Sequence, residues 1–367
     1  MQIKSKLKSL IKKFLYKKGL KTDRQIIVFE SDDWGAVRNS NKENIGVLHS
    51  EFSDLKVDNY TAFDCLENQE DVVKLKNILT NHTDSKGRKA KFTLNFATAN
   101  PDFERIKASD YDKFYYTMLD KNEEYKNVLS EIKLGIKDGC FQPQLHSREH
   151  LNSKFLMMDL KTNPCVRRAF DLNIVGVADD NYNGLDTLNQ ENNEQLLTEA
   201  MDCFERLFGY KSTTFIAPCY VWDTKDEKVL SSLGVKALQG KIFQNIPICR
   251  DVYKKKYRKF GSVSKSSGLK YFSRNCFFEP SKSRIEGKSN EEIIESTIRE
   301  IDFAFSCKKP AVICTHRVNY ASGIDESNRE ENIKCLNELL IKIKEKYVNV
   351  EFMSTDEYYK EMLDDRN

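Results

Sequence analysis

The stretch Gln25-Ile-Ile-Val-Phe-Glu-Ser-Asp-Asp-Trp-Gly35 places two adjacent carboxylates directly after an apolar run. A short apolar run bounded by turn-forming residues predicts a buried β-strand. Side chains at the carboxyl ends of parallel strands build the sites of α/β proteins, so Asp32 and Asp33 are candidate functional residues. The alternative is structural, because Asp also caps helices and forms Asx turns where a strand meets a loop.

On either side of this stretch, strand-like runs alternate with segments of helical periodicity. Such alternation predicts a parallel sheet covered by helices, and about eight strands over roughly 340 residues suit an α/β barrel. We find no internal repeat and no Gly/Ser linker, so residues 25–367 are predicted to form one domain. The predicted strands span 25–30, 91–96, 140–145, 173–177, 213–217, 235–238, 311–315 and 348–352, and the predicted helices span 69–80, 111–137, 189–208, 290–306 and 328–346.

The composition of the 367-residue chain is that of a globular protein. Hydrophobic residues make up 40% and charged residues 31%, which excludes a collagen-like chain and bulk disorder. No run of about 18 apolar residues occurs, so no transmembrane helix is expected. The ten cysteines are scattered and form no Cys-x-x-Cys pair. We interpret them as buried free thiols and, because no secretory signal is evident, we expect a cytoplasmic protein.

Positive charge is concentrated in the leader, residues 1–24, which holds nine Lys or Arg and one acid. Apolar residues recur at helical spacing over 3–18 with lysines on the other face, which predicts a short basic amphipathic helix. One alternative is peripheral contact of residues 1–20 with an anionic membrane, at its inner face. The other is that the leader packs its apolar stripe on the body.

A second basic cluster, residues 250–260, is interleaved with aromatic side chains. The net charge of the whole chain is only +3, and the part outside the leader is mildly acidic, so nucleic acid is not expected as a partner. We interpret the cluster as a solvated loop or as a patch for an anionic sugar or a lipid head group.

Three of the five histidines follow strand-like runs. His146 and His150 are four residues apart, and if a helical turn begins there, both imidazoles lie about 6 Å apart on one face and suit one metal ion. His316 ends another apolar run, and a chance surface pair and a capping histidine are the alternatives. The Asp pair, the His pair and His316 all end predicted strands, however. Such ends converge on one face of a barrel, where two histidines and a carboxylate leave open positions for water and substrate.

A fourth strand end carries Pro218, Tyr220 and Trp222 after the run 213–217. Backbone N–H groups beyond the proline are candidates for binding an oxyanion that develops during hydrolysis. Trp34, Tyr220 and Trp222 are candidates for stacking on the apolar faces of sugar rings. Ordinary core packing is the alternative for each of these aromatic side chains.

Together these strand ends resemble the polysaccharide deacetylase family, the chitooligosaccharide deacetylase-type domain of carbohydrate esterase family 4. The family has an Asp-Asp pair after the first strand, a His-x-x-x-His segment, an Arg-x-Pro-aromatic loop and a late strand that ends in His. The corresponding segments are Ser31-Asp-Asp-Trp-Gly35, His146-Ser-Arg-Glu-His150, Ile216-Ala-Pro-Cys-Tyr220 and Ile313-Cys-Thr-His316, so the resemblance spans about residues 25–320.

The resemblance implies a distorted (β/α)7-type barrel behind the basic leader, and metal-assisted removal of acetyl groups from an N-acetylated or O-acetylated carbohydrate. It implies Asp32 as the general base and His316 as the general acid. The implied metal ligands are Asp33, His146 and His150, which suit Zn²⁺ best, while Co²⁺, Ni²⁺, Mn²⁺ and Fe²⁺ also fit. The substrate is expected to belong to surface polysaccharide metabolism, as a polymer or as a lipid-linked or nucleotide-linked precursor.

The resemblance further implies that Tyr220 donates its backbone N–H to the oxyanion. The residues expected to contact substrate are Trp34, Pro218, Tyr220, Trp222 and Arg317.

Two features depart from the family pattern. Ile216 stands where the family has an arginine that orients the base, and Arg38, Arg148 and Arg317 are candidates to replace that arginine. The family's fourth motif, an Asp/Trp cluster beside the catalytic histidine, is not evident near 238–240. Two alternatives therefore stay open. One is a metal hydrolase of another non-peptide C–N bond, and the other is a non-catalytic module that binds glycan or a membrane surface.

Overall fold

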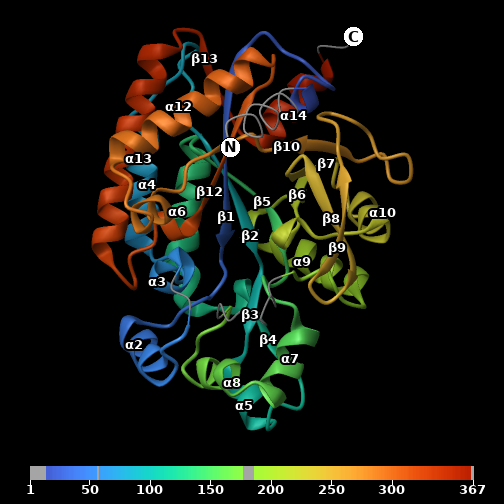
Figure 1. Ribbon diagram of the computed structural model, residues 1–367. Helices are drawn as coiled ribbons and strands as arrows, with labels where there is room; N and C mark the ends of the chain where they lie inside the picture. Colours follow the sequence, from blue (N-terminus) through green and yellow to red (C-terminus); the bar gives the residue numbers. More distant parts are fainter. Residues whose placement is uncertain (1–13, 56–57, 177–185, 365–367) are drawn as a thin grey trace, which may run out of the picture.

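The computed structural model describes residues 14–55, 58–176 and 186–364 of the chain. Its centre is a nine-stranded parallel sheet with the order β10-β7-β6-β5-β2-β1-β12-β11, in which β13 pairs with the first half of β1 (Figure 1). The strands of this sheet are β1 (Gln25–Trp34), β2 (Phe92–Ala97), β5 (Phe141–Ser147), β6 (Thr214–Ile216), β7 (Ala237–Gly240), β10 (Lys270–Ser273), β11 (Cys276–Phe277), β12 (Ala311–His316) and β13 (Val350–Met353).

The sheet curls into a barrel whose seam is closed by the chain itself. β10 and β11 stand at opposite ends of the strand order, yet only Arg274 and Asn275 separate them in sequence. The amide of Arg274 donates to the carbonyl oxygen of Gly240 (2.8 Å), and the amide of Asn275 donates to that of Val312 (3.1 Å). β10 and β11 thus form one split strand beside the six others of the barrel. This confirms the predicted distorted (β/α)7-type barrel.

Helices cover the barrel on both sides of β1. In the view of Figure 1, α4, α6, α12 and α13 lie to the left of β1, and α9 and α10 lie to the right. Val72 of α4, Ile132 of α6 and Leu339 of α13 share one buried cluster with Phe29 and Phe92 of the sheet. The helices are α2 (Lys42–Glu51), α3 (Asn59–Phe63), α4 (Gln69–Thr80), α5 (Phe103–Ala108), α6 (Lys126–Lys137), α7 (Ser153–Thr162), α8 (Pro164–Asp171), α9 (Asn193–Phe208), α10 (Thr224–Ser232), α11 (Pro280–Ile285), α12 (Asn290–Ser306), α13 (Glu326–Lys346) and α14 (Thr355–Asp364).

Most predicted elements are confirmed, and two are wrong. The predicted strand at 173–177 is not a strand over residues 173–176, where Asn173 adopts a left-handed φ of 57° that interrupts extended backbone; residue 177 lies outside the described residues. The predicted helix at 111–137 is helical only from Lys126 onward. Its first half instead contains β4 (Tyr116–Met118), which pairs with β3 (Ala99–Pro101), because tertiary pairing outweighs a weak helical pattern.

The described part of the leader packs on the barrel. Tyr16 is buried, the amide of Leu20 donates to Phe260 O (3.0 Å), and the amide of Thr22 donates to Lys308 O (3.0 Å). Residues 14–16 are helical, and residues 1–13 of the predicted helix lie outside the described residues. Membrane contact through residues 1–20 therefore stays a prediction. Among the described helices, we find none with the length and apolar character needed to cross a bilayer.

An antiparallel hairpin stands beside the barrel sheet. It consists of β8 (Phe243–Cys249) and β9 (Val252–Tyr257), so most of the basic cluster predicted at 250–260 is a strand and its turn. In Figure 1 the hairpin lies to the right of β1, near β6 and β7. It follows β7 directly in the chain, which places it next to the carboxyl ends of the barrel strands.

Candidate active site

A bulge at the end of β1 directs both adjacent carboxylates to the same cleft. The pairing of β1 with β2 shifts between Ser31 and Trp34, so β1 carries one extra residue there. Asp33 has a φ of 73°, which breaks the alternation of side chains along the strand. Asp32 and Asp33 consequently both line the cleft. Trp34 instead enters the core, where its indole N–H donates to Ser31 Oγ (2.9 Å).

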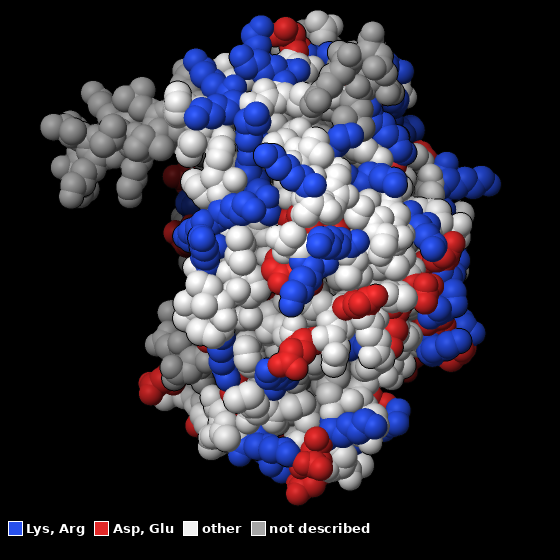
Figure 2. Space-filling view, turned by 90° about the vertical axis from the view of Figure 1, so that its right-hand side faces the viewer, with Lys and Arg blue, Asp and Glu red and all other residues white. Residues whose placement is uncertain are grey.

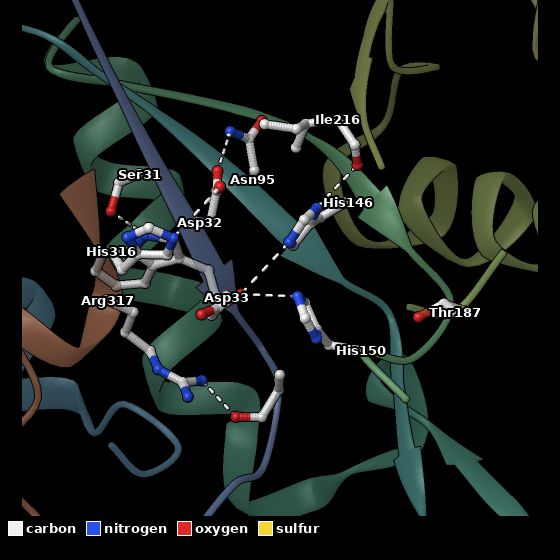
Figure 3. A network of polar contacts seen from close by, with 12 residues as sticks. Ser31, Asp32, Asp33, Asn95, His146, His150, Thr187, Ile216, His316 and Arg317 are labelled. Carbon is white, nitrogen blue, oxygen red and sulfur yellow. Dashed lines mark hydrogen bonds and ion pairs between the residues drawn. The ribbon is translucent and has the colours of Figure 1, made fainter. Parts of the chain in front are cut away.

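The three predicted metal ligands lie together. The Nε2 atoms of His146 and His150 are each 3.4 Å from Oδ1 of Asp33, as Figure 3 shows. His146 lies at the end of β5, and His150 lies in the irregular turn that follows it. The helical turn suggested for this pair is wrong. Ser147, with a φ of 133°, redirects the chain so that the two rings approach to 4.9 Å between centroids.

The surroundings of both imidazoles suit metal ligands. Nδ1 of His146 lies 2.8 Å from the carbonyl oxygen of Ile216 and donates to it, which leaves the lone pair of Nε2 directed at Asp33. Burial lowers the pKa of His150 to about 3, so this ring is neutral near pH 7. Both Nε2 atoms and the Asp33 carboxylate oxygen therefore face one common point. Ligands bound at about 2.0 Å to a tetrahedral Zn²⁺ are roughly 3.3 Å apart, so these residues fit a metal ion.

Asp32 is held by Arg274, a residue that the sequence analysis missed. Nη2 and Nη1 of Arg274 donate to Oδ1 and Oδ2 of Asp32, each at 2.6 Å, and Nε donates to Glu30 (2.6 Å). Asn95 donates a further hydrogen bond to Asp32 (2.8 Å). Burial alone would raise the pKa of Asp32, but the charge of Arg274 outweighs it and lowers that pKa to about 2. Asp32 is therefore ionised and oriented.

The expectation that Arg38, Arg148 or Arg317 replaces the missing motif arginine is wrong. Their carboxylate hydrogen-bond partners are Asp64 for Arg38, Glu149 and Glu199 for Arg148, and Asp64 and Glu67 for Arg317. Arg274 reaches Asp32 because its side chain extends from the barrel seam to Glu30 and Asp32 on β1. A seam of this kind has no local sequence pattern, since β10 and β11 are brought together only by closure of the sheet.

His316, the last residue of β12, faces Asp32 across the cleft with its Nε2 atom 3.8 Å from Oδ2. Its Nδ1 donates to Oε1 of Glu279 (2.5 Å), whose Oε2 accepts from Asn319 (2.8 Å). Desolvation would lower the pKa of His316, but the charge of Glu279 raises it well above its usual value. Glu279 thus lies beside His316, at the place where the family's fourth motif was expected. Sequence reasoning missed it because it lies in the loop between β11 and α11.

These groups line one cleft of about 870 Å³, a volume typical of small-molecule sites. Aromatic side chains form part of its wall, including Tyr60, which meets His316 edge to face at 5.6 Å between ring centroids. Phe243 and Phe277 present exposed rings to solvent at this cleft, 42% and 40% exposed. A polar floor between aromatic walls suits a ligand with both hydroxyl groups and apolar ring faces.

Of the side chains predicted to contact substrate, only Tyr220 lines the cleft within the described part of the chain. Trp34 and Trp222 are 0% and 2% exposed and pack in separate core clusters. Pro218 is also buried. Arg317 is fully buried and donates to Asp64, Glu67 and the carbonyl of Ala36, and Figure 3 shows its guanidinium at this carbonyl rather than at Asp33 or the two histidines. For these four residues, core packing outweighs the predicted role.

The predicted oxyanion donor is also not available. The amide of Tyr220 donates to the carbonyl oxygen of Ala217 (2.9 Å), inside the turn Pro218–Tyr220. The next amide, of Val221, donates to Pro218 O (3.1 Å). Tyr220 contributes its ring and hydroxyl group to the cleft instead, the latter 3.4 Å from Nη1 of Arg274.

No family model matches the chain, and no curated protein matches it in sequence. Among solved structures, a candidate glycoside hydrolase/deacetylase from Parabacteroides distasonis aligns with a TM-score of 0.54 at 8% identity, over 93% of this chain and 71% of that one. For a candidate polysaccharide deacetylase from Mycobacterium smegmatis, the TM-score is 0.43 at 10% identity, over 95% of each chain. For the 4-alpha-glucanotransferase of Thermococcus litoralis, it is 0.47 at 12% identity. That alignment covers 92% of this chain but 40% of the transferase, so the chain spans about two fifths of its length.

At such low identities the likeness to solved structures is one of fold. It rests here on the Parabacteroides protein, whose alignment covers nearly the whole chain. The chain therefore shares the barrel fold of that protein, which is the fold that the resemblance of its strand-end motifs led us to expect.

Proposed function

We propose that the chain is a metal-dependent hydrolase that removes acetyl groups from an N-acetylated or O-acetylated carbohydrate. The observation that carries the proposal is the convergence of three units in one cleft. These units are the Asp33, His146 and His150 cluster, Asp32 held by Arg274, and His316 held by Glu279. A ligand cluster, a base and an acid are the parts that amide hydrolysis requires.

In this proposal Asp33, His146 and His150 hold a divalent cation, with Zn²⁺ best suited to one carboxylate and two imidazoles. Such a cation, when bound, polarises the acetyl carbonyl and lowers the pKa of water. The remaining chemistry belongs to the chain. Arg274 keeps Asp32 ionised, so that Asp32 accepts a proton from the water that adds to the acetyl carbon.

His316 completes the cycle as the acid. Glu279 favours its imidazolium form, so Nε2 carries a proton on the side that faces Asp32. That proton passes to the sugar nitrogen, or to the sugar oxygen of an ester, as its bond to the acetyl carbon breaks. The products are acetate and the free amine or hydroxyl group.

The alternative of a non-catalytic module was motivated by the missing motif arginine and by the basic leader, and Arg274 removes the first of these reasons. A metal hydrolase of another C–N bond remains the second candidate. The exposed aromatic rings at the cleft favour a sugar. We also propose a reducing compartment, the cytoplasm, because eight of the ten cysteines are buried, as cysteines that act as small apolar side chains are.

The test is elemental analysis of the purified full chain together with acetate release. We expect about one divalent cation per chain and its loss in Asp33→Ala, with an unchanged far-ultraviolet circular dichroism spectrum. Asp202→Ala, an exposed acid on α9, is the matched control and should keep the metal.

Acetate release should be measured on N-acetylhexosamine oligomers and O-acetylated sugars, with a cyclic amide as the competing substrate. Turnover of the cyclic amide alone would favour the second candidate. A full complement of metal in Asp33→Ala would contradict the ligand assignment.

A further inference from the structure

The unpaired charges of the cleft are positive. Lys241, Lys255 and Lys282 all line it, and none of the three has an ion-pair partner among the described residues. The acids that line the same cleft are each engaged. Asp32 is held by Arg274, Asp33 forms an ion pair with Arg38 (3.7 Å), Glu279 is held by His316 and Asn319, and Asp58 caps α3.

The three lysines come from three separate elements. Lys241 follows β7, and its ammonium group lies 4.2 Å from the centroid of the Tyr220 ring. Lys255 lies on β9 opposite Asn245, which also lines the cleft, and Lys282 lies on α11 shortly after Glu279. Like charges that converge on one cavity repel one another, and an anion bound between them removes that repulsion.

The surface around the hairpin extends the same charge. Figure 2 shows Lys and Arg gathered over the upper half of the side that carries β7, β8 and β9 in Figure 1. Lys254 and Lys256 flank Lys255 on β9, and all three are exposed. A field of one sign around a cleft raises the local concentration of ligands of the opposite sign.

We propose that the substrate carries an oxyanion group next to its acylated sugar, and that Lys241, Lys255 and Lys282 bind this group. The inference rests on the proposed function, since it takes the cleft as the substrate site. Lysine suits this task because its ammonium group is a compact point charge that binds phosphate or carboxylate from several directions. A neutral glycan would leave these charges unmatched. The substrate class is therefore an acidic or phosphate-linked acylated sugar.

The decisive measurement is calorimetric binding to the full chain after removal of metal with a chelator. The probes are inorganic diphosphate for a phosphate-linked substrate and a uronic acid trimer for an acidic glycan. We expect one of the two to bind, more weakly at higher salt. Binding should weaken roughly tenfold or more when Lys241, Lys255 and Lys282 are all changed to Gln. The matched control changes three exposed, unpaired lysines on the outer helices α6 and α13 to Gln, namely Lys133, Lys137 and Lys334.

Equal affinity of the cleft-lysine variant and the control variant would overturn the inference, as would failure of both probes to bind the wild-type chain. Because the binding is measured without metal and without turnover, it does not depend on deacetylation. If the wild-type chain binds neither probe but releases acetate from neutral sugars, that result contradicts this inference alone. Intact probe binding without any acetate release would contradict the proposed function alone.

Discussion

Arg274 and Arg317 are two fully buried arginines that each bridge two carboxylates. Arg274 joins Glu30 and Asp32 inside the barrel, and Arg317 joins Asp64 and Glu67 outside it. The sequence favours Arg317 as the functional arginine, since it directly follows His316. By position, Arg274 is the one that touches the cleft. The comparison teaches that a residue next to a motif residue in the sequence need not lie beside it in the folded site.

The reason lies in the geometry of a strand end. Once β12 ends at His316, the chain turns into the 3-10 segment Arg317–Asn319, which carries the next side chain away from the barrel interior. Arg317 therefore ties this segment to the loops that hold Asp64 and Glu67. Arg274, by contrast, sits in the seam between β10 and β11 and points inward over β1.

The largest expected effect is the one that the two arginines share. Arg274→Leu leaves Glu30 and Asp32 without their cation. Arg317→Leu leaves Glu67 without its cation and Asp64 with Arg38 alone. Each change should lower the free energy of unfolding by about 3–5 kcal/mol. Urea unfolding of the metal-free proteins measures both values. A loss under about 1 kcal/mol at either position would show that water replaces the arginine there and that its pairing matters little.

The next effect should separate the two arginines. Lysine cannot donate two parallel hydrogen bonds to one carboxylate, so Arg274→Lys should lower kcat roughly hundredfold, with KM and metal content nearly unchanged. Arg317→Lys should keep kcat within about threefold, because Arg317 touches no reacting group. Steady-state acetate release measures both. Equal losses of kcat in the two variants would contradict the inference that Arg274, and not Arg317, positions Asp32.

The smallest expected effect concerns the ion pair between Glu279 and His316. Glu279→Gln removes the charge that raises the pKa of His316, so the imidazolium loses its proton at lower pH. Since the acid must be protonated, the alkaline limb of kcat should move to lower pH, with a loss of roughly tenfold at pH 7. Glu345→Gln, an exposed change on α13, is the control for charge alone.

The pair of Glu279 and His316 also determines how the free energy of unfolding changes with pH. A histidine with a raised pKa in the folded state contributes its full stabilisation below its unfolded pKa of about 6.5 and loses it as pH rises through the folded value. The wild-type chain should thus lose this contribution on the alkaline side, and Glu279→Gln should lack it at every pH. An unchanged histidine titration by nuclear magnetic resonance in Glu279→Gln would contradict the assignment.

The sequence predicted which titratable residues form the site, but it did not predict how they approach one another. Asp32, Asp33, His146 and His316 lie at strand ends and His150 lies in the turn just after one, and the rule that strand ends converge in a barrel was enough to predict them together. Their exact approach was not predictable. It depends on the bulge after Ser31 and on the left-handed Asp33, whereas the sequence suggested a helical turn for the two histidines.

What the sequence by itself determined was the periodicity of the chain: which segments form strands and helices, and which titratable residues end the strands. These properties are local, since they depend on residues within one turn or one strand of each other. Only the tertiary structure decided which arginine holds Asp32, which carboxylate holds His316 and which tryptophans are core. Those contacts depend on where the barrel closes, and closure joins residues far apart in the chain whose proximity no local pattern encodes.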